Sequence, residues 1–379
     1  MDGYNGCMPT PSILPVPARL SMFGAPRMSL RRWVISAGVL LLVASGTTLA
    51  SVSSAGAAAS PIAIHSQFKV NLVATGTGGQ VNPDDVAVLG KRVFIGYQNG
   101  VGAMGEPASG TGQTQSTVVE YSLRGKPVAS WNVIGKVDGL GEDVSTNEVL
   151  ATVNEDGNSS IYAIHPLTNQ VVHLTYNVDP ASLGGGGTDA VAVNDGQIFI
   201  GGSNPSAANA PALYTAVLNE TSGVATLTSV FNDNASASGP GGPVTLALTD
   251  PDSNAVVPFQ SPRFGGDVVL NSQGDSKLIF AHHAASAEQT LTQLPIPTQI
   301  DDITWATSAT GKLYLTDNKD NRLYTISTAS FVPGTVFIDT ASDSSTPGFV
   351  GTLNLTTGQI TPVVVGFSNP HGLRFVPDA

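Results

Sequence analysis

Six short stretches of the sequence begin with an acidic residue or a histidine and continue mainly with small and apolar residues. The six leading residues are Asp84, Glu142, Asp189, Asp252, Asp301 and His371. Carboxylates that converge on one point repel one another, and a bound cation or raised pKa values would relieve that repulsion. Oxygen-rich sites suit Ca²⁺ or Mg²⁺. We therefore take four acids as candidate metal ligands: Glu142, Asp189, Asp252 and Asp301.

A second set of polar residues lies at or near the ends of apolar runs that follow five of these stretches, as in RVFIGYQN (92–99) and QIFIGGSN (197–204). Such nearly continuous apolar runs are typical of strands buried on both faces. We expect each run to be the second strand of the unit that its stretch begins, with KLYLTDN (312–318) following the stretch at Asp301. The residues of this second set are Gln98, Asn154, Asn204, Gln273 and Asn318. We expect them just outside the six leading residues, as further binding candidates.

The recurring acids also have a purely structural interpretation. An acid that enters a strand can accept hydrogen bonds from backbone N–H groups of a neighbouring unit and hold the two units together. Because the acid appears in most of the six stretches, the repetition favours this interpretation over a specific chemical role.

The spacing of the stretches indicates the architecture that would position these side chains. The intervals between the leading residues are 58, 47, 63, 49 and 70 residues. These suit a four-stranded blade with its loops better than a helical repeat. Hairpin patterns such as IYAIHPLTNQVVHL (161–174) supply third and fourth strands. We predict an all-β fold, a six-bladed β-propeller with blades starting near residues 84, 142, 189, 252, 301 and 371.

The last interval contains more strand-like sequence than one blade needs. We interpret the excess as an inserted hairpin, and a seventh, degenerate blade is the alternative. The chain ends on HGLRFVPDA (371–379), a lone first strand, and FKVNLVAT (68–75) near the other end can supply a partner strand. We expect the two ends to meet in one blade and close the ring.

The first 59 residues read as a leader with a secretory signal peptide, followed by the propeller domain at 60–379. Arg31 and Arg32 precede an apolar run from Val34 to Ala44, and a small-residue stretch follows it. The run is short for a membrane span, which needs about 20 residues. We expect export by the general secretory route, with the twin-arginine route and an uncleaved anchor as alternatives. Met22 or Met28 is an alternative start.

Composition excludes several classes of partner and chemistry. Twelve basic and 27 acidic residues follow residue 59, a net charge of −15, and the one cysteine is Cys7 in the leader. A nucleic-acid partner needs a basic face, which this balance argues against. Without cysteine, the exported domain has no disulfide or thiol chemistry.

Two segments carry a family resemblance. GKLYLTDNKDNRLYTIS (311–327) resembles the NHL repeat, and NPHGLRFVPD (369–378) is similar to the start of a blade there and in gluconolactonase-like propellers. The resemblance implies a six-bladed fold and, in the gluconolactonase group, one divalent cation at the channel mouth. The early glutamate of that group has no counterpart in IAIHSQFKVNLV (62–73).

These observations leave two functions open. The first is a secreted, monomeric, non-catalytic module that binds a protein, glycan or small molecule on its loop-rich face. The second is a metal-dependent hydrolase of the gluconolactonase type. No nucleophile–base pair stands out. His282 and His283 are adjacent on a strand and point to opposite faces, so they are poorly placed to chelate one ion.

Overall fold

The computed structural model describes residues 60–205, 209–341 and 348–378. These residues form strands and a single 3₁₀ turn, η1 (Pro180–Leu183), and no helix among them is long and apolar enough to cross a membrane. The all-β propeller fold predicted from the sequence is confirmed. The predicted leader and its alternative starts lie outside the described residues.

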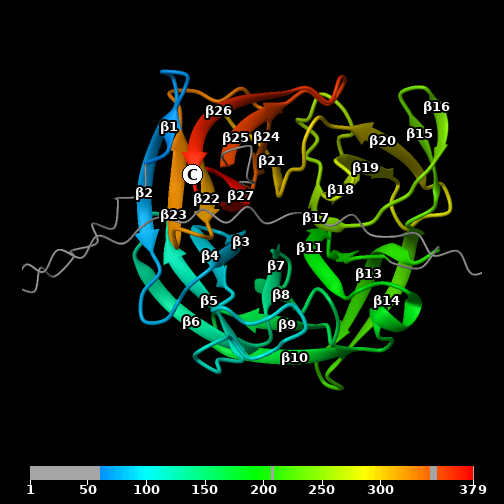
Figure 1. Ribbon diagram of the computed structural model, residues 1–379, viewed down its shortest axis with the longest axis horizontal. Helices are drawn as coiled ribbons and strands as arrows, with labels where there is room; N and C mark the ends of the chain where they lie inside the picture. The colour runs from blue at the N-terminus through cyan, green and yellow to red at the C-terminus, as the bar shows by residue number, and fades with distance from the viewer. Residues whose placement is uncertain (1–59, 206–208, 342–347, 379) are drawn as a thin grey trace, which may run out of the picture. The chain divides into compact units, whose positions relative to one another are not determined.

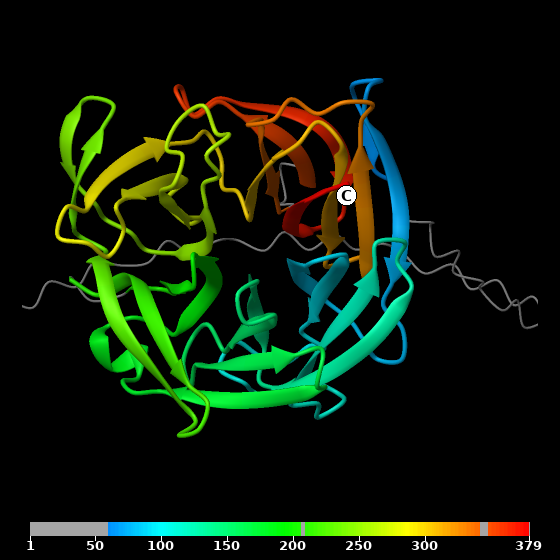
Figure 2. The same cartoon turned by 180° about the vertical axis from the view of Figure 1, so that it is seen from behind.

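Six strands surround the centre of the described ring (Figures 1 and 2). In chain order they are β3 (Pro83–Leu89), β7 (Val137–Asp143), β11 (Thr188–Asn194), β17 (Pro251–Val256), β21 (Ile303–Trp305) and β27 (Pro370–Pro377). Each contacts the next along the chain, and β27 contacts β3, so the contacts run in a closed circle. Closure of this kind leaves no long exposed sheet edge at the centre.

The first three blades are each built outward from one inner strand. Their outer strands are β4 (Arg92–Tyr97), β5 (Gln115–Ser122) and β6 (Pro127–Ile134); β8 (Glu148–Val153), β9 (Ser160–His165) and β10 (Gln170–Tyr176); and β12 (Gln197–Gly202), β13 (Pro211–Asn219) and β14 (Val224–Asn232). A short parallel pairing between β10 and β14 merges the second and third blades into one sheet of eight strands.

The next two blades carry extra strands at their rims. The fourth adds β18 (Val268–Ser272), β19 (Lys277–His282) and β20 (Thr290–Pro295), with the hairpin β15 (Ser236–Gly239) and β16 (Gly242–Thr245) beside β20. The fifth adds β24 (Val336–Thr340), β25 (Gly348–Leu353) and β26 (Ile360–Phe367), with β1 (Ile62–Ala63) at its edge.

The last blade joins the two ends of the described chain. Its strand order is β27, β22 (Gly311–Asp317), β23 (Arg322–Ser327) and β2 (Lys69–Thr75). The terminal segments therefore meet in one sheet, as the sequence suggested, but as its innermost and outermost strands.

One strand assignment was wrong. The sequence placed KLYLTDN (312–318) in the blade that begins at Asp301, whereas this run forms β22 and pairs with β27. The fifth blade instead continues from β21 directly to β24. The inserted hairpin is thus β22–β23, and it supplies the two middle strands of the closing blade.

Burial along the strands follows their position in a blade. Every residue of β4 after Arg92 is buried, whereas β6 at the rim alternates, with Trp131 and Val133 facing inward. The buried apolar side chains form clusters between neighbouring blades; one contains Leu140 of β7 beside Ala87 and Phe94 of the first blade. Burial of apolar area between blades is the main stabilising contribution in such a fold.

Candidate functional site

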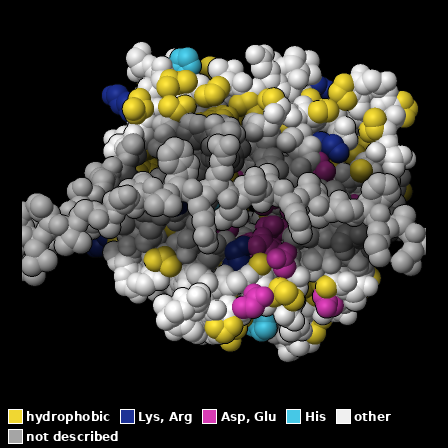
Figure 3. Space-filling model, in the orientation of Figure 1, with side chains coloured by type: hydrophobic (Ala, Val, Ile, Leu, Met, Phe, Trp, Pro, Cys, Tyr) yellow, Lys and Arg dark blue, Asp and Glu magenta, His cyan; other side chains and the backbone are white. Residues whose placement is uncertain are grey.

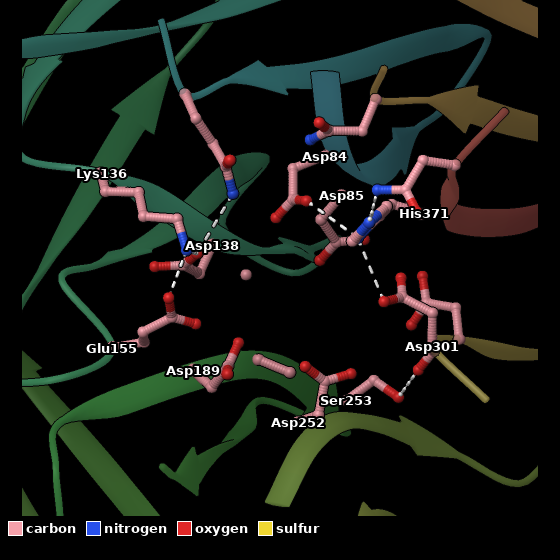
Figure 4. A pocket seen from close by; sticks show the side chains of 17 residues that line it. Asp84, Asp85, Lys136, Asp138, Glu155, Asp189, Asp252, Ser253, Asp301 and His371 are labelled. Carbon is pink, nitrogen blue, oxygen red and sulfur yellow. Dashed lines mark hydrogen bonds and ion pairs between the residues drawn. The ribbon is translucent and has the colours of Figure 1, made fainter. Parts of the chain in front are cut away.

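The six inner strands begin around one cavity of about 220 Å³. The second residue of five of these strands, and Asp301 two residues before β21, form a ring of side chains around it (Figure 4). This ring, called the acidic ring below, comprises Asp84, Asp138, Asp189, Asp252, Asp301 and His371. The same cavity, called the acidic chamber, is also lined by Asp85, Gln98, Lys136, Glu155, Asp302, Asn318 and Asn369.

A change of register around the ring position explains how these strands present their side chains. The pairing of β3 with β4 shifts between Pro83 and Val86, and that of β7 with β8 between Val137 and Leu140. A bulge re-aims side chains and interrupts strict alternation. Consecutive residues such as Asp84 and Asp85 therefore both reach the chamber.

Small residues follow the acidic ring where the inner strands come close together. A Cβ atom on Gly139 would lie 2.6 Å from the Cα of Ala190. At Gly372 the backbone has a φ of 50°, and a Cβ atom would lie 2.2 Å from the carbonyl oxygen of Asp84. Both positions require glycine, the first for space and the second for space and conformation.

The sequence suggested that the ring acids accept backbone hydrogen bonds from adjacent blades. In the structure, the acids that follow two of them in sequence make such bonds. Oδ2 of Asp85 accepts a hydrogen bond from the backbone N–H of Leu140 in the next blade at 2.6 Å. Oδ2 of Asp302 does the same with the N–H of Leu373 at 2.8 Å. These two carboxyl groups tie adjacent blades together.

Hydroxyl groups make similar ties to the backbone of the acidic ring. Thr316 Oγ1 donates towards the carbonyl oxygens of Asp84 and His371, at 2.5 Å from each, and Ser253 Oγ donates to that of Asp301 at 2.5 Å. The carboxyl groups of Asp138, Asp252 and Asp301 interact with amide side chains instead. Gln98 donates to Asp138, and Nε2 of Gln273 lies 3.2 Å from both Asp252 Oδ2 and Asp301 Oδ1.

Two cationic side chains lie among the acids. Nζ of Lys136 lies 2.8 Å from Oδ1 of Asp138 and also contacts Glu155. Nδ1 of His371 lies 3.1 Å from Oδ1 of Asp301 and 3.3 Å from Oδ1 of Asp84. Burial by itself lowers the pKa of His371, but the carboxylates of Asp301 and Asp84 outweigh it and raise that pKa well above its usual range.

The other carboxyl groups resist ionisation. Burial, reinforced by neighbouring acids, raises the pKa values of Asp138, Asp189 and Asp252 well above their usual range. Burial raises the pKa of Asp85 to about 7. Asp138 is 5% exposed, and its Oδ2 has no hydrogen-bond partner. The chamber therefore holds more carboxyl groups than its own two cations can neutralise.

Most of the residues proposed from the sequence lie at or beside this chamber. The ring contains Asp84, Asp189, Asp252, Asp301 and His371, while Gln98 and Asn318 line the cavity and Gln273 bonds to two ring acids. Asn154 and Asn204 do not line it. Asn154 instead accepts a hydrogen bond from the N–H of Lys136, and Asn204 donates to Asp156.

Glu142 was wrongly placed. It lies towards the far end of β7, where it contacts Arg374 and accepts a hydrogen bond from the N–H of Val88 at 3.3 Å. The ring position of this blade is Asp138, because KVDGLG (136–141), not EDVST (142–146), matches the start of the other inner strands. The spacing in the sequence already favoured Asp138. With Asp138 as the ring residue, the intervals from Asp84 and to Asp189 are 54 and 51 residues, which are more even than the 58 and 47 obtained with Glu142.

The remaining polar chamber residues missed at the sequence level include Asp85, Lys136, Glu155, Asp302 and Asn369. Asp85 and Asp302 were visible as the second acid of DDVAV and DDITWA. Lys136 lies just before the inner strand β7, and Glu155 lies just after the second strand of the same blade, β8. Only the folded blade brings the two side chains into contact.

The spacing of the ring limits how a metal ion could bind. Among the His, Cys, Asp and Glu side chains of the described residues, one group of three places its ligand atoms within 4.8 Å of one another: Glu148, His165 and Glu220, outside the chamber. There His165 contacts Glu148 through Nδ1 at 3.3 Å and Glu220 through Nε2 at 3.1 Å. The two nitrogens of His165 face different carboxylates, so the group consists of one contact within the second blade, to Glu148, and one contact to the third blade, at Glu220.

Comparisons with known proteins give distant likenesses only. No family model and no curated protein matches this sequence. A gluconolactonase from Xanthomonas campestris is 13% identical, with 71% of this chain and 94% of that chain covered and a TM-score of 0.38. A functionally unknown protein from Desulfotomaculum acetoxidans is 12% identical, with 79% and 90% covered and a TM-score of 0.41.

Hydrazine synthase from Kuenenia stuttgartiensis is a further match, 12% identical over 72% of this chain and 66% of that chain, with a TM-score of 0.36. The chain is a β-propeller, as its own strand pairing shows. A propeller supports many unrelated functions, so the fold does not indicate which one this chain has.

Figure 3 shows acidic side chains gathered near the middle of one face of the propeller, with a basic side chain beside them. Eight carboxyl groups line the acidic chamber, against Lys136 and His371 as the cations. A cavity with this balance repels anions and attracts cations.

Proposed function

We propose that this propeller is a non-catalytic module that binds a small cation in its acidic chamber. The observation that carries the proposal is Oδ2 of Asp138, a buried carboxyl oxygen without a partner beside a cavity rich in further carboxyl groups. A bound cation would give this oxygen a partner and would favour ionisation of its neighbours.

The size of the ring indicates the kind of cation. Among the described residues, no three Asp, Glu or His ligand atoms of the chamber lie within 4.8 Å of one another. The carboxyl and amide oxygens suit a hard cation, but this spacing does not suit a bare ion held directly by three carboxylates. It fits a divalent ion that keeps part of its hydration shell, or an alkylammonium group. Both sources present positive charge with N–H or O–H donors to the carboxylates.

Thermal unfolding of the full chain tests this proposal. After chelator treatment, CaCl₂, MgCl₂ or 1,4-diaminobutane is added at constant ionic strength. A cation at one hundred times its dissociation constant stabilises the folded state by about 2.7 kcal/mol. The expected result is a rise of a few degrees in Tm, which is typical of such a gain in a large domain. The cation that gives the rise identifies the source of charge.

Two variants locate the effect. Asp189→Asn removes a carboxylate of the acidic ring and should abolish the rise. His282→Ala should leave it unchanged, because His282 lies at the far end of β19 and bonds to Asp267 at 2.7 Å, away from the chamber. No rise with any of the three cations would contradict the proposal and leave the chamber with a structural role.

A metal-dependent hydrolase is the second candidate. It is favoured by the pKa of about 7 at Asp85, since a carboxyl group that titrates near neutrality can act as a general acid or base. However, both Oδ atoms of Asp85 already accept backbone hydrogen bonds. Release of acid from glucono-δ-lactone, followed by pH-stat with and without CaCl₂, would distinguish a hydrolase from a binding module.

We also propose that the propeller acts outside the cytoplasm as a monomer. The support is the basic and apolar pattern of residues 31–44, the excess of acid and the absence of cysteine after residue 59. Fractionation of cells that express the full chain, with N-terminal sequencing of the exported product, tests export. Light scattering tests the monomer.

A further inference from the structure

A second cavity lies at the opposite ends of the same six inner strands. It has a volume of about 330 Å³. Its apolar lining includes Val88, Val193, Val256, Ile303, Trp305 and Phe375. We call it the apolar chamber. Small-molecule sites are concave, mostly apolar and about this size, with a few polar groups that fix orientation.

The walls of the apolar chamber are already fixed. The indole N–H of Trp305 donates to Oγ of Ser261 at 3.1 Å, and the backbone N–H of Phe375 donates to Oγ1 of Thr304 at 3.1 Å. Trp305 is 3% exposed. A ligand would meet a preformed surface, so little conformational entropy is lost on binding.

One ion pair, between Glu142 and Arg374, supplies the principal polar surface. Oε1 of Glu142 contacts the guanidinium, and Oε2 accepts a hydrogen bond from the N–H of Val88. The side chain of Arg374 is 34% exposed and that of Glu142 only 15%. Guanidinium has five N–H donors, so the accessible hydrogen-bonding capacity of the pair lies in donors. A ligand should therefore present an acceptor.

The surrounding charges select a neutral acceptor over an anion. Oε1 of Glu142 already contacts the guanidinium of Arg374 and offsets its positive charge. A carboxylate ligand would bring a second negative charge next to Glu142 and would be repelled by it. A carbonyl oxygen accepts from guanidinium without that cost.

We propose that the apolar chamber binds a neutral organic molecule with a ring-sized apolar body and a carbonyl acceptor directed at Arg374. An apolar cavity of about 150 Å³ is enough to hold benzene. At about 330 Å³, this chamber has room for one ring and a carbonyl substituent. The site is separate from the acidic chamber and does not depend on cation binding there.

Isothermal titration of the full chain with a matched series tests the chemistry. The probes are acetophenone, with a carbonyl; ethylbenzene, without one; and benzoate, an anion. Acetophenone should bind about threefold to tenfold more tightly than ethylbenzene, the usual contribution of one hydrogen bond. Benzoate should bind more weakly than acetophenone. Equal affinities, or benzoate as the tightest ligand, would overturn the assignment.

Variants in the third blade locate the site. Val193→Trp fills the chamber and should abolish binding of acetophenone. Val217→Trp is the matched control, because Val217 is 69% exposed on β13 and lies outside the chamber. Undiminished binding in a folded Val193→Trp protein would overturn the proposal. The double variant Glu142→Gln with Arg374→Met should remove the preference for acetophenone over ethylbenzene.

A measurement without variants covers the case in which Val193→Trp does not fold. Crystals soaked in 4′-bromoacetophenone should show the anomalous signal of bromine inside the apolar chamber, next to Trp305. A signal only elsewhere, or none at a concentration that saturates binding in solution, would contradict the proposal. Cation binding, measured on the same variants, tests the acidic chamber separately, so either proposal can fail without the other.

Discussion

Nδ1 of His371 lies 3.1 Å from Oδ1 of Asp301, so the last inner strand, β27, is held electrostatically to the chain entering β21. The same nitrogen lies 3.3 Å from Asp84 on β3. His371 therefore joins the closing strand to both of its neighbours in the ring.

His371→Gln should destabilise the fold in a pH-dependent way. The folded-state pKa of His371 is raised, so its contribution is fully present below its unfolded pKa of about 6.5 and is lost as pH rises through the folded value. We expect a loss of about 1 to 3 kcal/mol at pH 6, less than for a fully buried pair. Urea unfolding at pH 6 and pH 10 measures it. An equal loss at both values would exclude the ionic contribution.

Asp85→Asn should reduce the dependence of stability on pH. The folded pKa of Asp85 is about 7, above its ordinary 3.8, so the folded state keeps a proton that the unfolded state releases. The contribution of this group to stability therefore falls as pH rises from about 4 to about 7, by a few kcal/mol in order of magnitude. Urea unfolding in chelator between pH 5 and pH 8 should show a shallower slope for the variant.

Asp195→Asn is the control for that slope, because Asp195 is exposed in the turn after β11. A slope for Asp85→Asn as steep as that of the unchanged chain would show that Asp85 is ionised in the folded protein.

Lys136→Met should strengthen cation binding while weakening the cation-free fold. The substitution removes the charge that faces Asp138 and Glu155. Loss of one partner from a buried ion pair costs about 3 to 5 kcal/mol. Without Lys136, the bound cation is no longer repelled by a neighbouring positive charge. We expect its affinity to rise about tenfold, which corresponds to about 1.4 kcal/mol and is less than the full repulsion between two close charges. Calorimetric titration with the cation that raises the Tm checks this.

Lys136→Arg keeps the charge and serves as the matched variant. An affinity that is the same in Lys136→Met, Lys136→Arg and the unchanged chain would place the bound cation away from Lys136.

Leu373→Ala should destabilise the closing blade. Leu373 on β27 is 2% exposed and packs in the cluster that contains Leu313 and Leu315 of β22. Truncation of a buried leucine costs about 2 to 5 kcal/mol. Leu167, which is 74% exposed in the β9–β10 turn, is the matched control, and its truncation should cost no more than about 0.5 kcal/mol. Both free energies of unfolding are measured by urea unfolding. Similar losses at the two positions would contradict the prediction that packing of β27 in the closing blade stabilises the fold.

Local pattern was enough to predict the strands and most of the acidic ring. In apolar runs such as RVFIGY and in the stretches DDVAV and DAVAV, neighbouring residues alone are enough to predict a strand and to locate its acid. Every ring residue except Asp138 was found in this way, because the start of an inner strand repeats the same small pattern. In the second blade both Asp138 and Glu142 begin a stretch that resembles this pattern, and Glu142 was selected although it gives the less regular spacing.

Pairing between distant segments was decided only by the tertiary structure. Nothing in KLYLTDN states whether it pairs with the strand before it or with β27, since hydrogen bonds between strands are made by backbone groups that every residue carries. The same holds for Lys136 and Glu155, which lie in different elements and meet only when the blade forms. The sequence thus determined which residues form strands and which strand starts bear acids, whereas closure of the ring determined which charges share a chamber.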